Sequence, residues 1–370
     1  MSAVVSPRIR NATLTALSGL LLLAGAGSAQ ATNKVGWVWA DQPDASGPYT
    51  PDTSYSFNST GGSITVTPQS QGQYLVDFAG LAGNDPSNVQ VTAYATSGYC
   101  QSTGWIKGFH GIAEASVQCF DAKGTPQNSY FTLLYQQRSA PVGNGADKSM
   151  AYLMADQPTA ANYTPNANLN YNPTGTLNTV TRSGPGDYVA HLPGLVQSGG
   201  NVQVTAVDFS GAGARCKIGA NGWQSGATET FVNVACFDDH GAPADKMFSL
   251  AYTLHEPYGL TTEKHSKAAY GYAHKPKNTK TYNVYKPFAF SSLGAGNMTS
   301  QKSSPGNYQV SFRGELPGYN SSLVLVTSDK SNAANAYCNV LDWFPINVTC
   351  FQQGGKPIDA TFNVTFQTAE

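Results

Sequence analysis

Apolar and polar residues alternate with a period of two along many short segments of this chain. Between residues 74 and 78, Tyr74, Val76 and Phe78 share one face of the pattern, while Leu75 and Asp77 lie on the other. Such alternation is typical of a β-strand with one buried face, and Gly-containing turn sequences separate the segments. We therefore expect antiparallel sheets, each with one face on a core and the other in water. In the first third of the chain, strands are predicted near residues 35–40, 54–59, 63–68, 73–79, 88–95, 98–106, 112–120 and 128–136.

The same pattern occurs three times along the chain. A Gly-x-Tyr hairpin begins at Gly72, Gly186 and Gly306, and each copy continues with a cysteine, a tryptophan and a second cysteine. About 115 residues separate equivalent cysteines, far more than the roughly 20–50 residues of a solenoid repeat, so each copy is long enough to bury a core of its own. The closing stretch of each copy keeps one spacing: Cys119, Phe120, Gly124 and Pro126; Cys236, Phe237, Gly241 and Pro243; Cys350, Phe351, Gly355 and Pro357.

The repeat sets the predicted fold class and the domain organisation. We predict an all-β chain with three tandem antiparallel β domains, at residues 32–138, 149–255 and 268–370. Each domain is predicted to be a sandwich, and a small up-and-down barrel is the alternative closure of an eight-strand meander. Linkers are expected at residues 139–145 and 256–268.

The cysteines occupy the same two positions in every copy. Six cysteines allow many pairings, but only one set of three pairs gives three equivalent domains. A metal site is a poorer interpretation because the sequence has no CxxC pair and no histidine cluster near the cysteines. One disulfide per domain is therefore predicted: Cys100–Cys119, Cys216–Cys236 and Cys338–Cys350.

The first thirty-one residues have the pattern of an export signal. Arg8 and Arg10 precede a mainly apolar stretch from residue 14 to 26, and a small-x-small cleavage site ends at Ala31. Residues 1–31 are thus predicted to be a signal peptide, removed near Ala31 to leave a secreted protein in the periplasm or outside the cell. Because no later apolar run approaches about 18 residues, we expect no membrane span.

Charge is sparse, which limits the classes of partner. Only 12% of the residues are charged and the formal net charge is −1, so nothing in the charge favours nucleic acid as a partner. A local lysine cluster near the second linker suggests an anionic polymer, and the alternative is a solvated linker and edge strand. Its members are Lys264, Lys267, Lys275, Lys277, Lys280 and Lys286.

Catalytic and cofactor motifs are not evident. The sequence has no nucleophile elbow, HExxH, P-loop, dinucleotide-binding or EF-hand motif. None of the six histidines recurs with a partner at an equivalent position, so each is expected to be an ordinary surface residue. We predict no catalytic residue, no metal site and no cofactor, and a binding module rather than an enzyme.

Two recurring features are candidate ligand sites. A tryptophan lies between the two cysteines of each copy, where it is either an exposed platform for sugar or aromatic rings or a core residue packed on the disulfide. The dipeptide Asp-Gln follows the first strand of the first two copies, where it either binds a polar ligand or satisfies the nearby backbone. The residues are Trp105, Trp223 and Trp343, with Asp41, Gln42, Asp156 and Gln157.

The first-strand Ala-Asp-Gln-Pro, the Gly-x-Tyr hairpin and the Cys-Phe-Asp-x-x-Gly-x-Pro ending resemble a tandem repeat of uncharacterised secreted bacterial β-domain proteins, a resemblance that implies no known activity. Our leading hypothesis is a secreted, non-enzymatic, multivalent binding protein for a surface or polymeric ligand, such as a glycan or cell-envelope component. The alternatives are a structural or assembly protein of the cell exterior, and a secreted hydrolase or hydrolase inhibitor.

Overall fold

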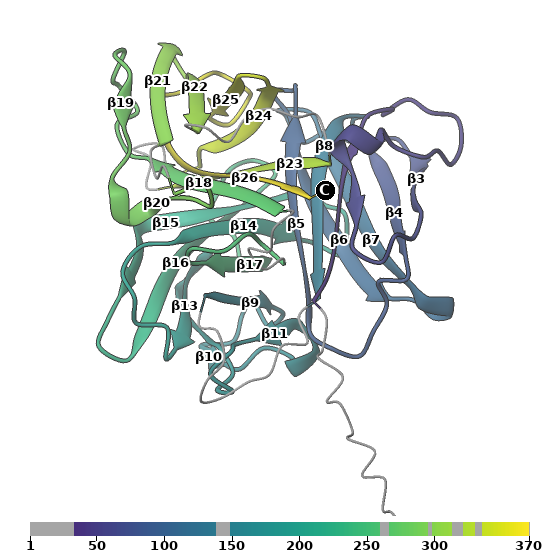
Figure 1. Cartoon of the computed structure of the whole chain (residues 1–370), viewed down its shortest axis with the longest axis horizontal. Helices are drawn as coiled ribbons and strands as arrows, with labels where there is room; N and C mark the ends of the chain where they lie inside the picture. The colour runs from purple at the N-terminus through teal and green to yellow at the C-terminus, as the bar shows by residue number, and fades with distance from the viewer. Residues whose placement is uncertain are drawn as a thin grey trace, which may run out of the picture. The chain divides into compact units, whose positions relative to one another are not determined.

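The structure, a computed structural model, describes residues 33–137, 149–259, 266–294, 298–312, 321–329 and 335–369 (Figure 1). These segments contain strands and short 3-10 turns and no α-helix. Within the same ranges, no helix has the length and apolar character that a membrane crossing requires. The all-β prediction is confirmed. The predicted signal peptide and the first linker lie outside the described residues.

The three repeats have similar orders of elements, with 3-10 turns labelled η. The first repeat has one additional 3-10 turn, η2, and lacks the short strand that precedes the 3-10 turn in the other two. The first contains β1 Lys34–Ala40, η1 Thr53–Tyr55, β2 Phe57–Asn58, β3 Ile64–Ser70, β4 Gln73–Ala79, β5 Ser87–Tyr94, β6 Tyr99–Lys107, η2 Phe109–Gly111, β7 Ile112–Phe120 and β8 Tyr130–Gln137. The second contains β9 Met150–Ala155, β10 Asn162–Tyr163, η3 Ala167–Leu169, β11 Asn170–Tyr171, β12 Thr179–Gly184, β13 Asp187–Pro193, β14 Asn201–Val207, β15 Ala214–Ser225, β16 Glu229–Asp238 and β17 Met247–Thr253. The third contains β18 Ser266–Ala273, β19 Tyr282–Asn283, η4 Lys286–Phe288, β20 Ala289–Ser291, β21 Met298–Ser304, β22 Asn307–Phe312, β23 Ser322–Asp329, β24 Tyr337–Trp343, β25 Ile346–Phe351 and β26 Thr361–Ala369.

Each repeat is a sandwich of two antiparallel sheets, which we call inner and outer. Val38, Phe78 and Leu133 are fully buried between the two sheets of the first repeat, and each other repeat has its own equivalent cluster. The sheets are not closed into barrels, so the sandwich is confirmed and the barrel alternative is wrong. The inner sheets are β2-β1-β8-β5, β11-β9-β17-β14 and β20-β18-β26-β23, and the outer sheets are β3-β4-β7-β6, β10-β12-β13-β16-β15 and β19-β21-β22-β25-β24.

The predicted strands of the first repeat agree with the structure except at residues 54–59. There the chain forms η1 and the two-residue strand β2. Asp52 caps this turn, because its Oδ1 accepts a hydrogen bond of 2.8 Å from the Ser54 backbone N–H. The first part of the predicted strand is therefore a capped 3-10 turn, and only Phe57 and Asn58 form a strand.

All three predicted disulfides are confirmed. Each joins directly opposed residues of neighbouring outer-sheet strands, which are β6 and β7 in the first repeat. The bonds are Cys100–Cys119, Cys216–Cys236 and Cys338–Cys350.

The repeats are joined in a cycle, which Figure 1 lets the reader follow around β5, β14 and β23. The inner edge strand β5 pairs in parallel with β24 of the third repeat, where Tyr94 opposes Val340. Likewise β14 pairs with β6 of the first repeat, where Val207 opposes Ser102. The third inner edge strand, β23, contacts β15 of the second repeat. Each inner sheet therefore meets the outer sheet of another repeat.

This cycle corrects the prediction that every sheet has one wet face. The outer sheets follow it, since buried and partly exposed residues alternate along β4. The inner sheets do not, because their second face packs against the other repeats. Asn88, Gln90 and Thr92 occupy polar positions of β5, yet their exposed fractions are only 0%, 1% and 5%.

The second predicted linker is not solvated throughout, because one of its residues is buried between repeats. Its Tyr258 is fully buried, and the hydroxyl donates to the Asn201 backbone oxygen at 2.9 Å. The Gln367 side chain accepts a hydrogen bond from the Tyr258 backbone N–H at 3.0 Å. This residue therefore ties the second repeat to the third. Of the lysine cluster, Lys275, Lys277, Lys280 and Lys286 are exposed, whereas Lys264 lies outside the described residues.

Candidate functional site

A ring of three threonines links the repeats where β5, β14 and β23 meet. The Thr205 hydroxyl accepts from the Val91 backbone N–H at 2.8 Å and donates to the Gln90 side chain at 3.0 Å. The equivalent Thr327 and Thr92 also bridge to another repeat, so the ring is closed. Thr327 bonds Val204 N at 3.0 Å and Gln203 Oε1 at 2.8 Å, and Thr92 bonds Val326 N at 3.1 Å.

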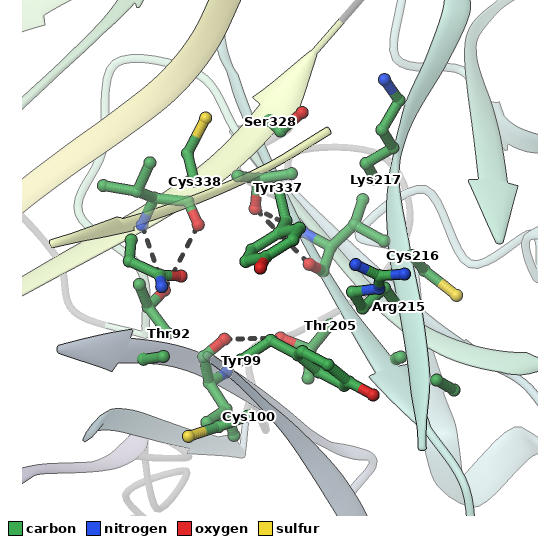
Figure 2. Close-up of a pocket in the computed structure, with 18 residues that line it drawn as sticks. Thr92, Tyr99, Cys100, Thr205, Arg215, Cys216, Lys217, Ser328, Tyr337 and Cys338 are labelled. Atoms are coloured by element: carbon green, nitrogen blue, oxygen red, sulfur yellow. Dashed lines mark hydrogen bonds between the residues drawn. The ribbon is translucent and has the colours of Figure 1, made fainter. Parts of the chain in front are cut away.

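Beside this ring lies a cavity of about 50 Å³ lined by all three repeats, which we call the axis cavity (Figure 2). The residues just before the first cysteine of each repeat meet there, and they are Tyr99, Arg215 and Tyr337. The guanidinium carbon of Arg215 lies 4.9 Å from the ring centroids of both tyrosines. One repeat thus places a cation between two aromatic faces, a favourable arrangement when it is desolvated.

Arg215 is the less satisfied of two buried cations at this cavity. Only 6% of the residue is exposed. Its Nη2 donates to the Gln353 side chain and to the Asp238 backbone oxygen. Among the residues that the structure describes, its Nε and Nη1 have no hydrogen-bond partner. Burial lowers the pKa of this guanidinium, although the nearby tyrosines and aspartates oppose the shift.

Lys217, two residues further along β15, also lines the axis cavity. It is 6% exposed, and desolvation lowers the pKa of its ammonium group to about 8. The carboxylate of the fully buried Asp329 opposes this shift by favouring the charged lysine. The second repeat therefore supplies two cations where the other repeats have tyrosines and amides.

The tryptophans are mainly core residues rather than platforms. Trp223 and Trp343 are 5% and 3% exposed, so of the two alternatives the core residue, not the exposed platform, is observed for these two. Trp105 is partly buried, and its indole N–H donates to the Ser87 hydroxyl at 3.0 Å. The physical reason is the cyclic packing, which covers the tryptophan of one repeat with the first strand and 3-10 turn of another.

Trp343 borders a cluster of aromatic side chains that the sequence did not predict. Trp343 contacts Tyr55 and Tyr94 of the first repeat, with ring centroids 5.1 and 6.1 Å apart. Trp39 in turn contacts Tyr55, Tyr94 and Tyr130 at 5.2, 5.3 and 6.0 Å. Tyr94 and Tyr130 are directly opposed on β5 and β8. Aromatic residues at the outward positions of these strands were the available signal.

We call Trp39, Tyr55, Tyr94 and Tyr130 the aromatic surface, because all four are partly accessible to solvent. Tyr130 is the most open at 38% exposed, and the other three are intermediate. Burial raises the pKa of Tyr94 to about 12, so its hydroxyl is protonated and available as a hydrogen-bond donor. The exposed Asp342 lies near enough to add to that shift.

The Asp-Gln dipeptides mainly hold loops in place. Asp41 Oδ2 accepts from the Asp52 backbone N–H at 3.3 Å, and Asp156 Oδ2 accepts from the Asn166 backbone N–H at 3.2 Å. Gln42 and Gln157 are exposed beside them. Backbone satisfaction, the alternative considered from the sequence, is thus observed, and a ligand role for these residues stays a prediction.

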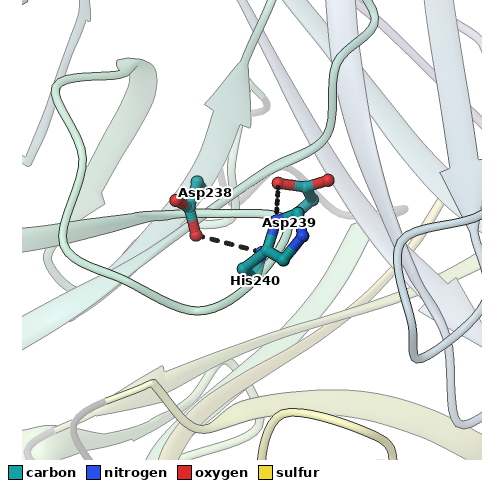
Figure 3. A group of neighbouring side chains, drawn as sticks. All are labelled: Asp238, Asp239 and His240. Carbon is teal, nitrogen blue, oxygen red and sulfur yellow. Dashed lines mark hydrogen bonds and ion pairs between the residues drawn. The ribbon is translucent and has the colours of Figure 1, made fainter.

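Asp238, Asp239 and His240 bring metal-ligating groups within 4.8 Å of one another (Figure 3). Their local geometry explains the cluster without an ion. Asp238 accepts from the backbone N–H groups of His240 and Ala242 at 3.0 and 2.9 Å. His240 is 84% exposed and contacts Asp239 at 2.7 Å. The group is a side-chain-stabilised turn.

His191 has a hydroxyl and a carboxylate as neighbours, as the histidine of a catalytic triad does. Its Nε2 lies 3.0 Å from the Thr181 hydroxyl and its Nδ1 lies 3.5 Å from Glu229. These residues lie on the solvent side of the outer sheet, and neither the axis cavity nor the groove beside Ile106 and Lys107 includes them. The geometry therefore gives little support to the hydrolase hypothesis.

Comparison of the chain with protein-family models, with curated proteins and with solved structures finds no match.

Proposed function

We propose that the chain is an exported, non-enzymatic binding protein that recognises a neutral carbohydrate polymer through the aromatic surface. The observation that carries this proposal is the grouping of four partly exposed rings, with Trp39 at their centre. Aromatic faces stack on the apolar C–H faces of sugar rings, and tyrosine hydroxyls hydrogen-bond sugar hydroxyls. The predicted export signal and the three disulfides support an extracellular location.

The absence of charge among the four rings favours a neutral ligand. An anionic glycan would need cations at its carboxylate or sulfate groups, whereas the charged residue type beside Tyr94 is an aspartate, Asp342. Asp342 is exposed and can accept hydrogen bonds from sugar hydroxyls. The surface thus combines stacking with a polar edge.

The proposal replaces three equivalent sites with one. At the positions of Trp39, the other repeats have Met154 and Tyr272, which precede the equivalent Ala155 and Ala273. Two of the three predicted tryptophan platforms are buried. Avidity from repetition is therefore not part of the mechanism, and one chain should bind one stretch of polymer.

Binding of the mature chain to insoluble β-glucans, chitin and a glycan array tests this proposal. Tyr130→Ala and Tyr94→Ala should each weaken binding roughly two- to tenfold, because an aromatic stacking contact is worth about 0.5–1.5 kcal/mol. Tyr285→Ala is the matched control, since Tyr285 is 59% exposed and lies in the third repeat.

Failure to bind any neutral glycan would reject the proposal, as would binding that both surface variants leave unchanged. Concentration-dependent assembly in light scattering, combined with no glycan binding, would favour the structural-protein hypothesis.

A further inference from the structure

The loop that follows the first strand is held in the same way in the first and third repeats. The Pro43 carbonyl oxygen accepts a hydrogen bond from the hydroxyl of the hairpin tyrosine at 3.0 Å, and the Pro276 oxygen does so at 3.1 Å. The Tyr49 hydroxyl accepts from the backbone N–H of the residue before Pro43 at 3.3 Å, and the Tyr282 hydroxyl makes the same contact before Pro276 at 3.1 Å. These contacts establish which positions of the two loops are equivalent.

At the equivalent positions, the third repeat has cations where the first has acids or neutral residues. The stretch between Glu263 and Glu315 contains no Asp or Glu at all. Because two loops with opposite charge make the same contacts, the fold does not require the lysines. In chain order, the first repeat has Asp41, Gln42, Asp44, Gly47 and Thr53 where the third has His274, Lys275, Lys277, Lys280 and Lys286.

Protection of an exposed sheet edge does not explain these lysines. The edge strand of the third outer sheet is β19, and lysines beside an edge can prevent it from pairing with other chains. In the other two repeats the corresponding edges are β3 and β10. The loops that precede or contain these edges, residues 41–55 and 156–169, have no lysine. The same edge is therefore tolerated twice without cations.

The four lysines of this loop, which we call the lysine surface, are exposed and form no ion pair with any residue that the structure describes. The acid within electrostatic range of Lys277 is Asp359, and Lys302 already pairs with it at 2.6 Å. The buried Asp329 is offset by Lys217. The lysine surface thus keeps a positive excess, and its members are Lys275, Lys277, Lys280 and Lys286.

One compact turn and its packing hold the lysine surface together. The Asn278 backbone N–H donates to the Lys275 carbonyl oxygen at 3.1 Å, and the Asn278 side chain accepts from the Lys280 backbone N–H at 3.2 Å. The 3-10 turn η4 begins at Lys286 and packs on the end of β18 through Phe288. The cations are therefore presented together by one ordered segment.

Uncharged polar groups between the lysines distinguish among anionic polymers. Thr279 and Asn283 are exposed there, and both can exchange hydrogen bonds with hydroxyl groups. A lysine ammonium is a point charge that can bind a single carboxylate. Double-stranded DNA carries one charge about every 1.7 Å, a density that a chain with formal net charge −1 is poorly suited to match.

We propose that the lysine surface is a second binding site, whose ligand is an acidic polysaccharide. The polymer's carboxylates lie at the lysines, and its hydroxyls lie at Thr279 and Asn283. This site shares no residue with the aromatic surface and does not depend on the binding of a neutral glycan. The two sites together would let one chain connect a neutral polymer to an acidic one.

Binding of the mature chain to polygalacturonate and alginate, measured by titration calorimetry, tests this proposal. We expect binding at low ionic strength. The affinity should fall at least about tenfold between roughly 0.02 and 0.2 M sodium chloride, because salt screens exposed charges. No binding to either polymer, or binding that salt leaves unchanged, would overturn the proposal. Equal affinity for single-stranded DNA would overturn the choice of a polysaccharide.

The double variant Lys275→Gln with Lys286→Thr introduces the residues of the first repeat at the equivalent positions, so it should fold. Its Kd for polygalacturonate should rise about two- to thirtyfold, since one exposed ion pair is worth about 0.2–1 kcal/mol. Lys123→Gln, which removes an exposed cation of the first repeat, is the matched control. An equal effect of the two variants would contradict the assignment.

Two further measurements separate this site from the aromatic surface and from any effect on folding. Tyr130→Ala should weaken neutral-glycan binding alone, and the lysine variant should weaken polygalacturonate binding alone, so either proposal can fail without the other. In the unaltered chain, polygalacturonate should protect the lysine surface from acetylation and leave Lys123 reactive. This result decides even if the double variant does not fold, and uniform protection of all lysines would contradict the site.

Discussion

Buried amides and hydroxyls join the repeats of this protein, alongside the buried charges of Lys217 and Asp329. Asn88 donates to the Ser249 hydroxyl of the second repeat at 2.6 Å, and Thr132 donates to the Val324 backbone oxygen of the third at 2.9 Å. Short uncharged groups suit this role because their hydrogen bonds can be fully satisfied without the desolvation cost of an ion. The low charge of the sequence is thus a property of the interior as well as of the surface.

Thr205→Val tests the threonine ring at one member. Valine has nearly the same shape, but it leaves the Val91 N–H and the Gln90 side-chain oxygen without their partner. We expect the free energy of unfolding to fall by about 1–3 kcal/mol, the usual cost of a buried unsatisfied group. Urea denaturation measures it, and Thr125→Val is the exposed control, with an expected change within about 0.5 kcal/mol. Similar losses in both variants would argue against the ring.

Asp245 makes the stability of the second repeat depend on acid pH. It occupies the position that accepts a hydrogen bond from the hairpin glycine in each repeat. Its Oδ1 accepts from the hairpin N–H of Gly186 at 2.9 Å, as Asn128 Oδ1 does from Gly72 at 2.7 Å. The hydrogen bond from Arg182 is the largest cause that lowers the pKa of Asp245. A lowered folded-state pKa contributes stability above the ordinary value of about 3.9, and this contribution is lost as the pH falls through the folded-state pKa.

Asp245→Asn should therefore flatten the acid limb of the stability curve. Asparagine is tolerated, because the first repeat uses it at the same place, but it cannot be charged. Urea midpoints from pH 6 to pH 2.5 should show a deficit for the variant at pH 6 that shrinks below pH 4. Asp187→Asn, at an exposed position, is the control and should follow the unaltered chain. A deficit that is constant with pH would contradict the assignment.

The hairpin before each β4-type strand depends on one glycine. Gly186 has a φ of +69°, and a Cβ there would lie 2.3 Å from the Cys236 backbone oxygen. The equivalent Gly72 and Gly306 have φ values of +72° and +74° and face the equivalent cysteine oxygens at 2.5 and 2.7 Å. The turn therefore docks directly on the disulfide-bearing strand of the outer sheet, which explains why the Gly-x-Tyr pattern recurs.

Gly186→Ala should destabilise the chain by at least about 2 kcal/mol, since both the left-handed backbone and the contact with a backbone oxygen are unfavourable. Gly184→Ala is a matched control two residues away, where φ is not left-handed and the added Cβ meets no atom within 4 Å. Thermal or urea unfolding of the two variants makes the comparison. Equal stabilities would show that the hairpin can shift to accept a side chain.

Strands, sandwiches and disulfides were predictable because they depend on local patterns and on repetition. The partners of the inner sheets were not, because period-two alternation cannot distinguish a polar face in water from a polar face against another polar face. Thr92 looks like any solvent-facing strand residue until Val326 is placed beside it. In the same way, the sequence around Trp343 does not predict its contacts with Tyr55 and Tyr94, which belong to another repeat.

In the whole molecule, apolar residues of all three sandwiches are buried together in a cluster that no single sandwich can form. A cluster separate from the three sandwich cores combines Trp37 and Leu134 with Tyr152 and Leu323, from all three repeats. An isolated repeat would expose this apolar surface together with its buried amides and hydroxyls. The repeats should therefore fold and unfold together although each has a core of its own.

Calorimetry of residues 32–370 should show one transition, with calorimetric and van't Hoff enthalpies that agree. The isolated segment 32–138 should be unfolded or self-associated, because Trp37 and Leu134, both fully buried in the chain, lose their partners. Cleavage at a protease site inserted in residues 139–145 should leave the fragments folded and associated, since the contacts among the repeats are non-covalent. Three separate transitions, or a stable monomer of residues 32–138, would show that the repeats are independent domains. A single transition that survives cleavage would instead show that packing among the repeats, rather than chain connectivity, makes the molecule one cooperative unit.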